Sequence, residues 1–175
     1  MKKNDLLEAW LNSWETSQSD FPESAAHKSE FPREYRAFFF CFNDAQFYEA
    51  HDVLEHLWLR CSDANRSYYQ ALIQLAGAFV HFQKQALFPD HPTHARRVAP
   101  GRRLLALARQ RFQSFPSTHL GVDVEALCSL CTLWDKQAAA TPIPLQTFAP
   151  PQLPLPSAHP VFSKPAPPAT PALRG

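Results

Sequence analysis

The sequence predicts an all-α protein, a compact helical bundle of about six helices followed by a disordered Pro-rich C-terminal tail. No segment alternates apolar and polar residues with period 2 over a useful length, whereas several segments repeat apolar residues at helical spacing. The chain has only 4 Gly, which argues against a turn-rich β-sandwich or barrel. Of its 17 Pro, 11 fall within residues 141–175, where neither helix nor sheet can propagate.

The bulk composition fits one domain and a tail. With 175 residues, 45% of them hydrophobic, the chain can bury a core, and we expect an all-α domain over residues 1–140 and the tail over 141–175. P-x-x-P spacings such as Pro151 to Pro154 suit a docking peptide, but the composition favours a solvated tail. With a net charge of +1, the chain has no overall electrostatic attraction for nucleic acid or anionic membranes. It contains no run of 18 apolar residues, so a membrane-spanning helix is not expected.

Each expected helix has a start signal or an apolar period. Asn4 or Asp5 can cap the first, Pro32 suits the first turn of the second, and Asp44 can cap the third. A polar turn at 62–67 precedes the fourth, and a loop with three Pro separates it from the last two. The expected helices span about residues 4–17, 33–42, 45–60, 68–85, 101–115 and 122–138, with the loop at 86–100.

The first residues give no sign of a secretion signal. Two lysines are followed by an amphipathic segment and not by an apolar stretch, so a signal peptide is not expected and the predicted location is cytoplasmic. The four cysteines, Cys41, Cys61, Cys128 and Cys131, are then expected to be reduced thiols. The Cys128-x-x-Cys131 spacing lies within an apolar helix, which favours buried small side chains over zinc binding or redox work.

The expected helix at 45–60 carries polar residues beside its core face. Its apolar arc consists of Phe47, Ala50, Leu54, Leu57 and Trp58, and Glu49, Asp52, His56 and Arg60 lie roughly opposite. His51 and Glu55 are one turn apart on the shoulder of the arc, with Tyr48 beside them. Partly buried polar side chains at such positions need partners.

The expected helix at 68–85 is apolar around most of its circumference, which is typical of a central helix. One polar stripe interrupts that surface at Gln70, Gln74 and His81. Gly77 lies on the same stripe and costs the helix about 1 kcal/mol relative to alanine. This cost is explained if another helix or a ligand approaches closely at Gly77.

Packed antiparallel, these two helices would enclose a small polar chamber. His51, Glu55 and His81 are suitable ligands for a divalent metal such as zinc, with open positions left for water. Asp52 can serve as a general base or can support a ligand. The predicted metal ligands are therefore His51, Glu55 and His81. Tyr48, Gln70 and Gln74 are predicted substrate contacts.

Two blocks of sequence resemble a known family. Residues 42–58, with the core Glu49-Ala50-His51-Asp52-Val53-Leu54-Glu55 before Trp58, resemble the signature of the domain-of-unknown-function 309 family, and residues 69–76 followed by His81 resemble its second block. The resemblance covers about residues 35–115. It implies a small all-α fold and brings the label of a predicted metal-dependent hydrolase without an established reaction. The positions that it implicates are Glu49, His51, Asp52, Glu55, Trp58, Gln70, Gln74 and His81.

The sequence departs from the family pattern in two places. Ala45 and Ala71 stand where the family usually has Gly, and the loop at 86–100 replaces a short Gly-Asn turn. These departures leave the polar stripes intact but alter the loop that leads to them.

Three functional hypotheses follow. The first is a metal-assisted hydrolase with Asp52 or Glu49 as the base and a small molecule of unknown identity as substrate. The second is a non-catalytic bundle that binds a ligand or a protein, in which the buried polar residues form a structural hydrogen-bond network. The third is a phosphate or nucleic-acid contact through Arg102, Arg103 and Arg109, although a solvated helix face explains these arginines and nucleic acid is not the expected partner. No membrane partner is expected, and a homo-oligomer remains open.

Overall fold

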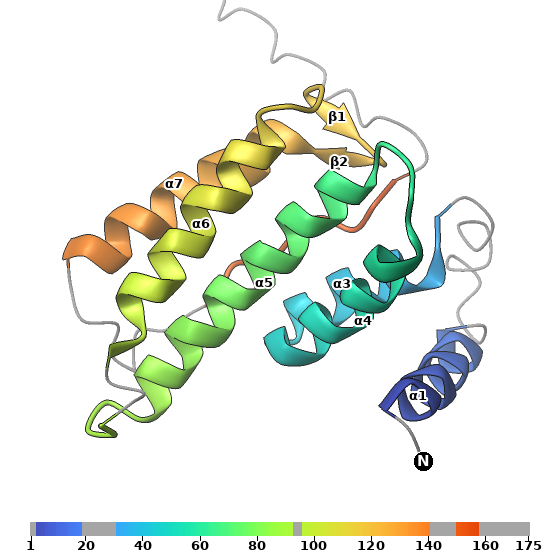
Figure 1. Cartoon of the computed structure of the whole chain (residues 1–175), viewed down its shortest axis with the longest axis horizontal. Coiled ribbons are helices and arrows are strands. Elements are labelled where there is room, and N and C mark those ends of the chain that lie inside the picture. The colour runs from blue at the N-terminus through green and yellow to red at the C-terminus, as the bar shows by residue number, and fades with distance from the viewer. Residues whose placement is uncertain (1–2, 19–30, 93–95, 141–149, 158–175) are drawn as a thin grey trace, which may run out of the picture.

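The computed structural model describes residues 3–18, 31–92, 96–140 and 150–157, in which helices account for 73% of the residues. The all-α prediction is confirmed (Figure 1). The described residues form six helices and one short hairpin: α1 (Lys3–Gln18), α3 (Arg33–Asn43), α4 (Phe47–Arg60), α5 (Arg66–Leu87), α6 (Val98–Phe112), β1 (Thr118–His119), β2 (Val122–Asp123) and α7 (Val124–Ala140).

Helix α5 lies at the centre of the bundle and packs on both α4 and α6, while α3 packs on α4 and α7 on α6 (Figure 1). Its apolar residues explain this position, because Leu72, Leu75 and Phe79 are fully buried. Although α5 is 22 residues long, no helix within the described parts of the chain is apolar enough over its length to cross a membrane.

The core is built largely from aromatic rings. Phe42 of α3, Phe47 of α4 and Phe79 of α5 meet with ring centroids 5.0–5.2 Å apart, and all three are fully buried. Phe79 and Phe82 continue the cluster to Trp134 of α7 at 4.9 and 6.1 Å. Such pairs contribute about 0.5–1.5 kcal/mol each beyond the area that they bury. One core therefore joins four helices.

Helix α6 begins at Val98, three residues earlier than the sequence predicts. Pro100 lies in its first turn, where the amide hydrogens have no partner within the helix and proline is tolerated. The buried face consists of Gly101, Leu105, Ala108 and Phe112. Leu107 lies off this face and is 43% exposed.

The hairpin β1–β2 was not predicted. Its strands pair antiparallel, with Thr118 opposite Asp123 and His119 opposite Val122. The two residues between them, Leu120 and Gly121, both have positive φ angles of 44° and 73°, as a two-residue turn of type I′ requires. Two-residue strands are too short to produce a period in the sequence.

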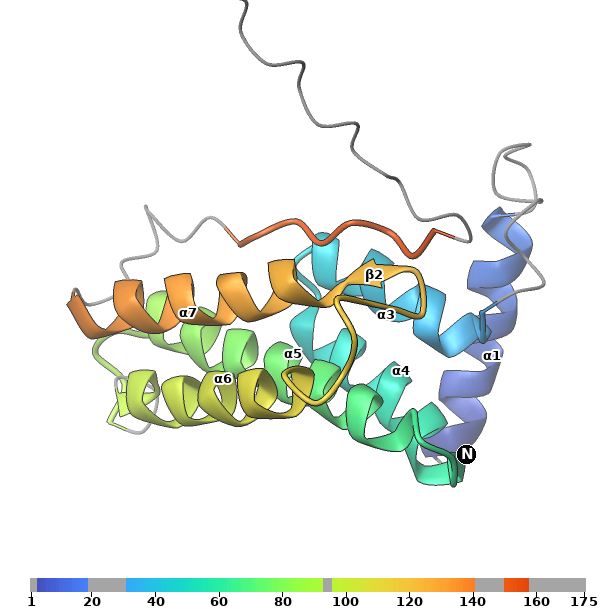
Figure 2. The same cartoon turned by 90° about the horizontal axis from the view of Figure 1, so that it is seen from above.

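Part of the proline-rich tail packs on the bundle. Residues 150–157 contain neither helix nor strand, as predicted, and run beside α3 and α7 (Figure 2). The side-chain amide of Asn43 donates to the carbonyl oxygen of Leu153 at 2.8 Å and accepts from its amide nitrogen at 2.7 Å. Leu153 is 3% exposed. A solvated tail therefore does not describe these eight residues, and residues 141–149 and 158–175 lie outside the described residues.

Candidate functional site

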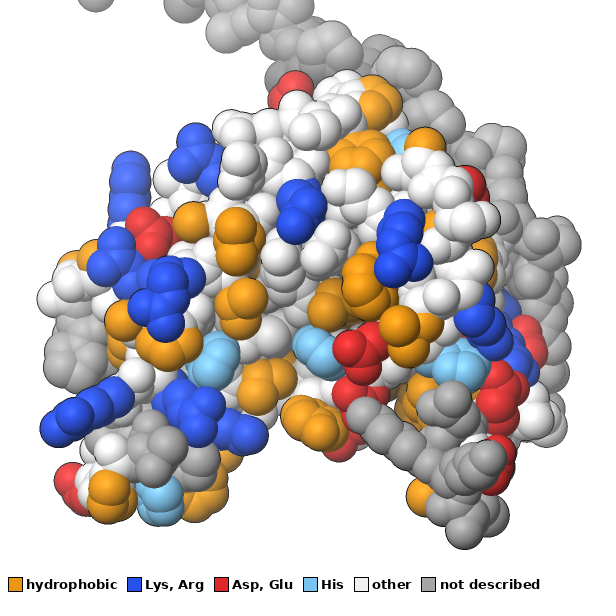
Figure 3. All heavy atoms as spheres, in the orientation of Figure 1, with side chains coloured by type: hydrophobic (Ala, Val, Ile, Leu, Met, Phe, Trp, Pro, Cys, Tyr) orange, Lys and Arg blue, Asp and Glu red, His pale blue; other side chains and the backbone are white. Residues whose placement is uncertain are grey.

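The polar stripes of α4 and α5 meet at Gly77. A Cβ atom built on Gly77 would lie 3.9 Å from Cδ2 of His51 on α4 and 3.2 Å from Cδ1 of Leu104 on α6. Gly77 thus faces both neighbouring helices, closely at Leu104 and at ordinary van der Waals distance from His51. Figure 3 shows histidine and acidic side chains together on the face where α4 and α5 adjoin.

Three residues of α4 form a compact cluster. His51, Asp52 and Glu55 each place a ligand atom within 4.8 Å of those of the other two. Nδ1 of His51 lies 3.4 Å from Oδ1 of Asp52, and the two side chains are 32% and 15% exposed. Asp52 is therefore turned toward His51 and is the less exposed of the two, although the helical arc placed it away from the core.

One distance in this cluster, between His51 and Asp52, fits a long hydrogen bond and also matches the separation of two ligands of one metal ion. Nitrogen–oxygen hydrogen bonds are usually about 2.7–3.2 Å long, so 3.4 Å between His51 and Asp52 is long. Neighbouring ligands of a tetrahedral zinc ion with bonds of about 2.0–2.2 Å lie about 3.3–3.6 Å apart. One imidazole and two carboxylates are also a common donor set for divalent ions.

His81 is not part of this cluster in the described residues. Its Nδ1 lies 3.5 Å from the NH1 atom of Arg97, just before α6. A guanidinium can only donate, so in this long contact Nδ1 of His81 is the acceptor and its Nε2 is left as the donor of the neutral ring. Burial, followed by the charges of Arg97, Lys84 and Arg103, lowers the pKa of His81. The structure thus places His81 with cations, and its role as a metal ligand stays a prediction.

The predicted substrate contacts lie along α4 and α5. Tyr48 is 56% exposed, and the Nζ atom of Lys84 lies 6.0 Å from the centroid of its ring. Gln74 accepts a hydrogen bond of 3.2 Å from Nε of Arg111 on α6. Gln70 is partly buried on α5. All of these positions remain predicted contacts, since the geometry names no substrate.

Glu49, the second candidate base, lies elsewhere. It is exposed, and its negative charge acts on Cys41 of α3, whose pKa is raised to about 12 by burial first and by Glu49 and Asp44 next. The cluster of α4 described above does not include Glu49. Of the two predicted bases, only Asp52 lies beside His51.

Of the cations around the α5 stripe, the sequence singled out Arg103 as a possible phosphate contact, but it did not connect any of them with His81. Lys84 comes from α5, Arg97 from the residue before α6, and Arg103 and Arg111 from α6. The available signal was a stretch without any acidic residue between Asp90 and Asp123. Its importance depends on the antiparallel register of α5 and α6, which brings the beginning of α6 to the end of α5.

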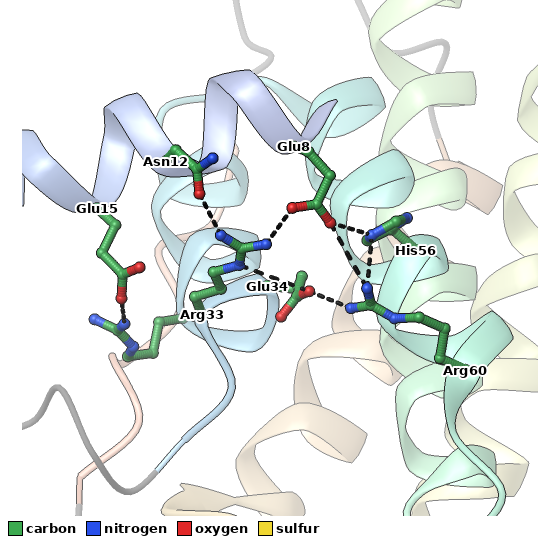
Figure 4. Close-up of polar contacts among 8 residues, drawn as sticks. Glu8, Asn12, Glu15, Arg33, Glu34, His56 and Arg60 are labelled. Carbon is green, nitrogen blue, oxygen red and sulfur yellow. Dashed lines mark hydrogen bonds and ion pairs between the residues drawn. The ribbon is translucent and has the colours of Figure 1, made fainter. Parts of the chain in front are cut away.

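A second acidic cluster, formed by Glu8, Glu34 and His56, is an ion-pair network (Figure 4). Arg33 pairs with Glu8, and Arg60 pairs with Glu34. Nε2 of His56 lies 2.7 Å from Glu8. The two guanidinium groups oppose the binding of a metal cation here. The side chain of His56 is 11% exposed because it contacts Glu8 of α1. It lies opposite the apolar arc of α4, as expected.

Other sequence motifs have structural roles. Cys131 is buried and Cys128 partly buried, and all four cysteines are free thiols. Burial raises the pKa of Cys131 to about 12, which makes it unreactive. The ring of Trp58 supports the guanidinium of Arg66, 4.1 Å from its centroid. The Asp90-His91-x-x-His94 motif includes residues outside the described ranges.

Comparison with known proteins identifies part of the chain. Residues 35–87 match the model of a family described as Domain of unknown function (DUF309). The match includes α4 and α5 and stops before α6, whereas the resemblance in the sequence was expected to continue to about residue 115. Searches of curated proteins and of solved structures gave no match. The matched residues 35–87 contain the α4 cluster and the polar stripe of α5, so this part of the chain is similar to the DUF309 family.

Proposed function

We propose that this protein is a metal-dependent hydrolase whose divalent ion is held by His51, Asp52 and Glu55. The observation that carries the proposal is the convergence of their ligand atoms within 4.8 Å on one half-exposed face of α4. His51 and Glu55 keep the roles predicted from the sequence, and Asp52 takes the place predicted for His81.

The residues themselves supply more than ligands. The 32% exposure of His51 leaves the cluster open to solvent on one side, so that water and a substrate can reach it. Asp52 carries two carboxylate oxygens, so it can hold a cation at one and take up a proton at the other. When bound, a divalent ion supplies Lewis-acid activation of water near neutral pH.

The test is hydrolysis by the full chain, purified without a histidine tag. Chromogenic phosphate and carboxylate esters are assayed after chelation and again after zinc or manganese is added. We expect metal-restored turnover that falls at least about tenfold in Glu55→Gln, because loss even of a group that only supports a metal ligand costs about 10–100-fold. Glu125→Gln is the matched control, because Glu125 is exposed on α7.

The outcome that would refute the proposal is turnover that survives chelation, or turnover that Glu55→Gln leaves unchanged. No turnover of any ester and no effect of metal would favour the second function instead.

One observation favours that second function, a non-catalytic bundle with a structural polar network. Gln74 and His81 on α5 are already contacted by Arg111 and Arg97 without any ligand. In that case His51→Ala should lower the free energy of unfolding by about 1–3 kcal/mol by removing a partner from the network. Under the metal proposal the same variant should be nearly as stable as the wild type in the absence of metal.

A further inference from the structure

The beginning of α6 and the end of α5 form a cationic patch around His81. Arg97, Lys84 and Arg103 all lie near enough to His81 to act on its charge. Figure 3 shows basic side chains gathered around a histidine over this part of the molecule. Three cations around one partly buried imidazole are costly unless something compensates for their repulsion.

Within the described residues no carboxylate neutralises this patch. Arg102, the neighbour of Arg103, shows the contrast, because it pairs with Asp135 of α7 at 2.7 Å. The chain has no acidic residue between Asp90 and Asp123 that would pair with Arg97 or Arg103 locally. The charge of the patch is therefore open to an anion from outside the chain.

Arg97 presents a donor that has no partner. Its Nε atom is buried and has no hydrogen-bond partner among the described residues, while its NH1 atom faces His81. A buried donor without a partner is unfavourable, and a small rotation of the guanidinium toward an anion would relieve it. Because Nδ1 of His81 is engaged, its Nε2–H is a further donor. Together with Lys84 and Arg103, the patch offers donors and positive charge.

The patch adjoins the α4 cluster. His81 lies one turn beyond Gly77, and Gly77 is the point that the His51 ring approaches. Lys84 reaches Tyr48, which lies one turn before Asp52 on α4. One molecule can therefore contact the cluster and the patch on the same face.

We propose that His81, Lys84, Arg97 and Arg103 bind a phosphate group of the substrate on which the α4 cluster acts. The identity of the ligand as a substrate rests on the proposed function. The binding of phosphate by these four residues does not require the metal. Guanidinium groups bind phosphate and carboxylate alike. Phosphate is favoured because several donors from separate elements surround the site, and a tetrahedral oxyanion has acceptors for all of them.

The experiment measures the binding of inorganic phosphate to the full chain after chelation, by isothermal titration calorimetry at fixed ionic strength, with acetate in a parallel titration. We expect saturable phosphate binding at one site in the wild type and in Glu55→Gln. Arg97→Met should weaken it at least about tenfold, the usual effect of losing one charge-assisted contact. Lys136→Met, which removes an exposed positive charge of α7, should leave it unchanged.

Arg103→Met provides a second variant at an exposed position, in case Arg97→Met does not fold. Phosphate binding that is equal in Arg97→Met, Arg103→Met and the wild type would overturn the inference, as would acetate binding as tight as phosphate. Phosphate binding that needs added metal and disappears in Glu55→Gln would also overturn it, while leaving the proposed function intact. Phosphate binding without any metal binding would support the inference and reject the proposed function.

Discussion

Replacing Gly101 with alanine tests the close packing of α5 on α6, on which the position of the cationic patch depends. A Cβ atom at Gly101 would lie 2.5, 2.9 and 3.0 Å from three ring atoms of Phe82. Phe82 is fully buried and stacks on Trp134 with an angle of 18° between the rings. The ring cannot move aside without disturbing the aromatic cluster, so the helices must separate.

The same substitution at Gly77 is the matched control. There the added methyl group would meet Leu104 at 3.2 Å and His51 at 3.9 Å, and the end of the partly buried Leu104 side chain can give way. Alanine gains about 1 kcal/mol over glycine within a helix, whereas overpacking costs about 1–3 kcal/mol. We therefore expect Gly101→Ala to destabilise the protein by about 1–2 kcal/mol and Gly77→Ala to stabilise it by up to about 1 kcal/mol.

Urea unfolding followed by circular dichroism measures both changes under the same conditions. The reasoning is refuted if Gly101→Ala is as stable as the wild type, or if the two variants change the free energy of unfolding in the same direction by the same amount.

Three further perturbations test other parts of the structure. Asn43→Ala should lower the free energy of unfolding by about 1–3 kcal/mol. The double mutant Asn43→Ala/Leu153→Ala should lose less than the sum of the two single losses, because both changes release the same segment. Losses that add up in urea unfolding would contradict this. Burial lowers the pKa of His119, so the folded state binds fewer protons, and stability should fall as pH drops below about 6.5. His119→Gln should reduce that slope, and an unchanged slope in unfolding experiments between pH 7 and 5 would count against it. Glu8→Gln should cost less than about 1 kcal/mol, and the loss should shrink in high salt, as thermal melts at two ionic strengths can show. A larger loss that is independent of salt would mean that Glu8 acts through hydrogen bonds and not through screened ion pairs.

The sequence predicts the helices well because each has an apolar face of sufficient length. The pairing of His51 with Glu55 was predictable for the same reason, since residues one turn apart share a face whatever the tertiary structure. Gly77 indicated a close approach because glycine in the middle of a helix is otherwise costly.

What the sequence did not predict depends on how elements pack together. His81 lies on the expected face, but the register of α5 against α6 turns it toward Arg97. The docking of Leu153 depends on Asn43, which lies 110 positions away in the chain. The hairpin turn at Leu120 and Gly121 needs two positive φ angles, and leucine gives no sign of one.

The most direct test of the central claim is the stoichiometry of metal binding by the untagged full chain. Calorimetric titration of the chelator-treated protein with zinc should show one site in the wild type and in the matched control Glu125→Gln. In Glu55→Gln and in His51→Ala that site should be lost or weakened at least about tenfold. If the wild type binds no zinc or manganese, or if both variants bind as tightly as the wild type, then His51, Asp52 and Glu55 do not form a metal centre.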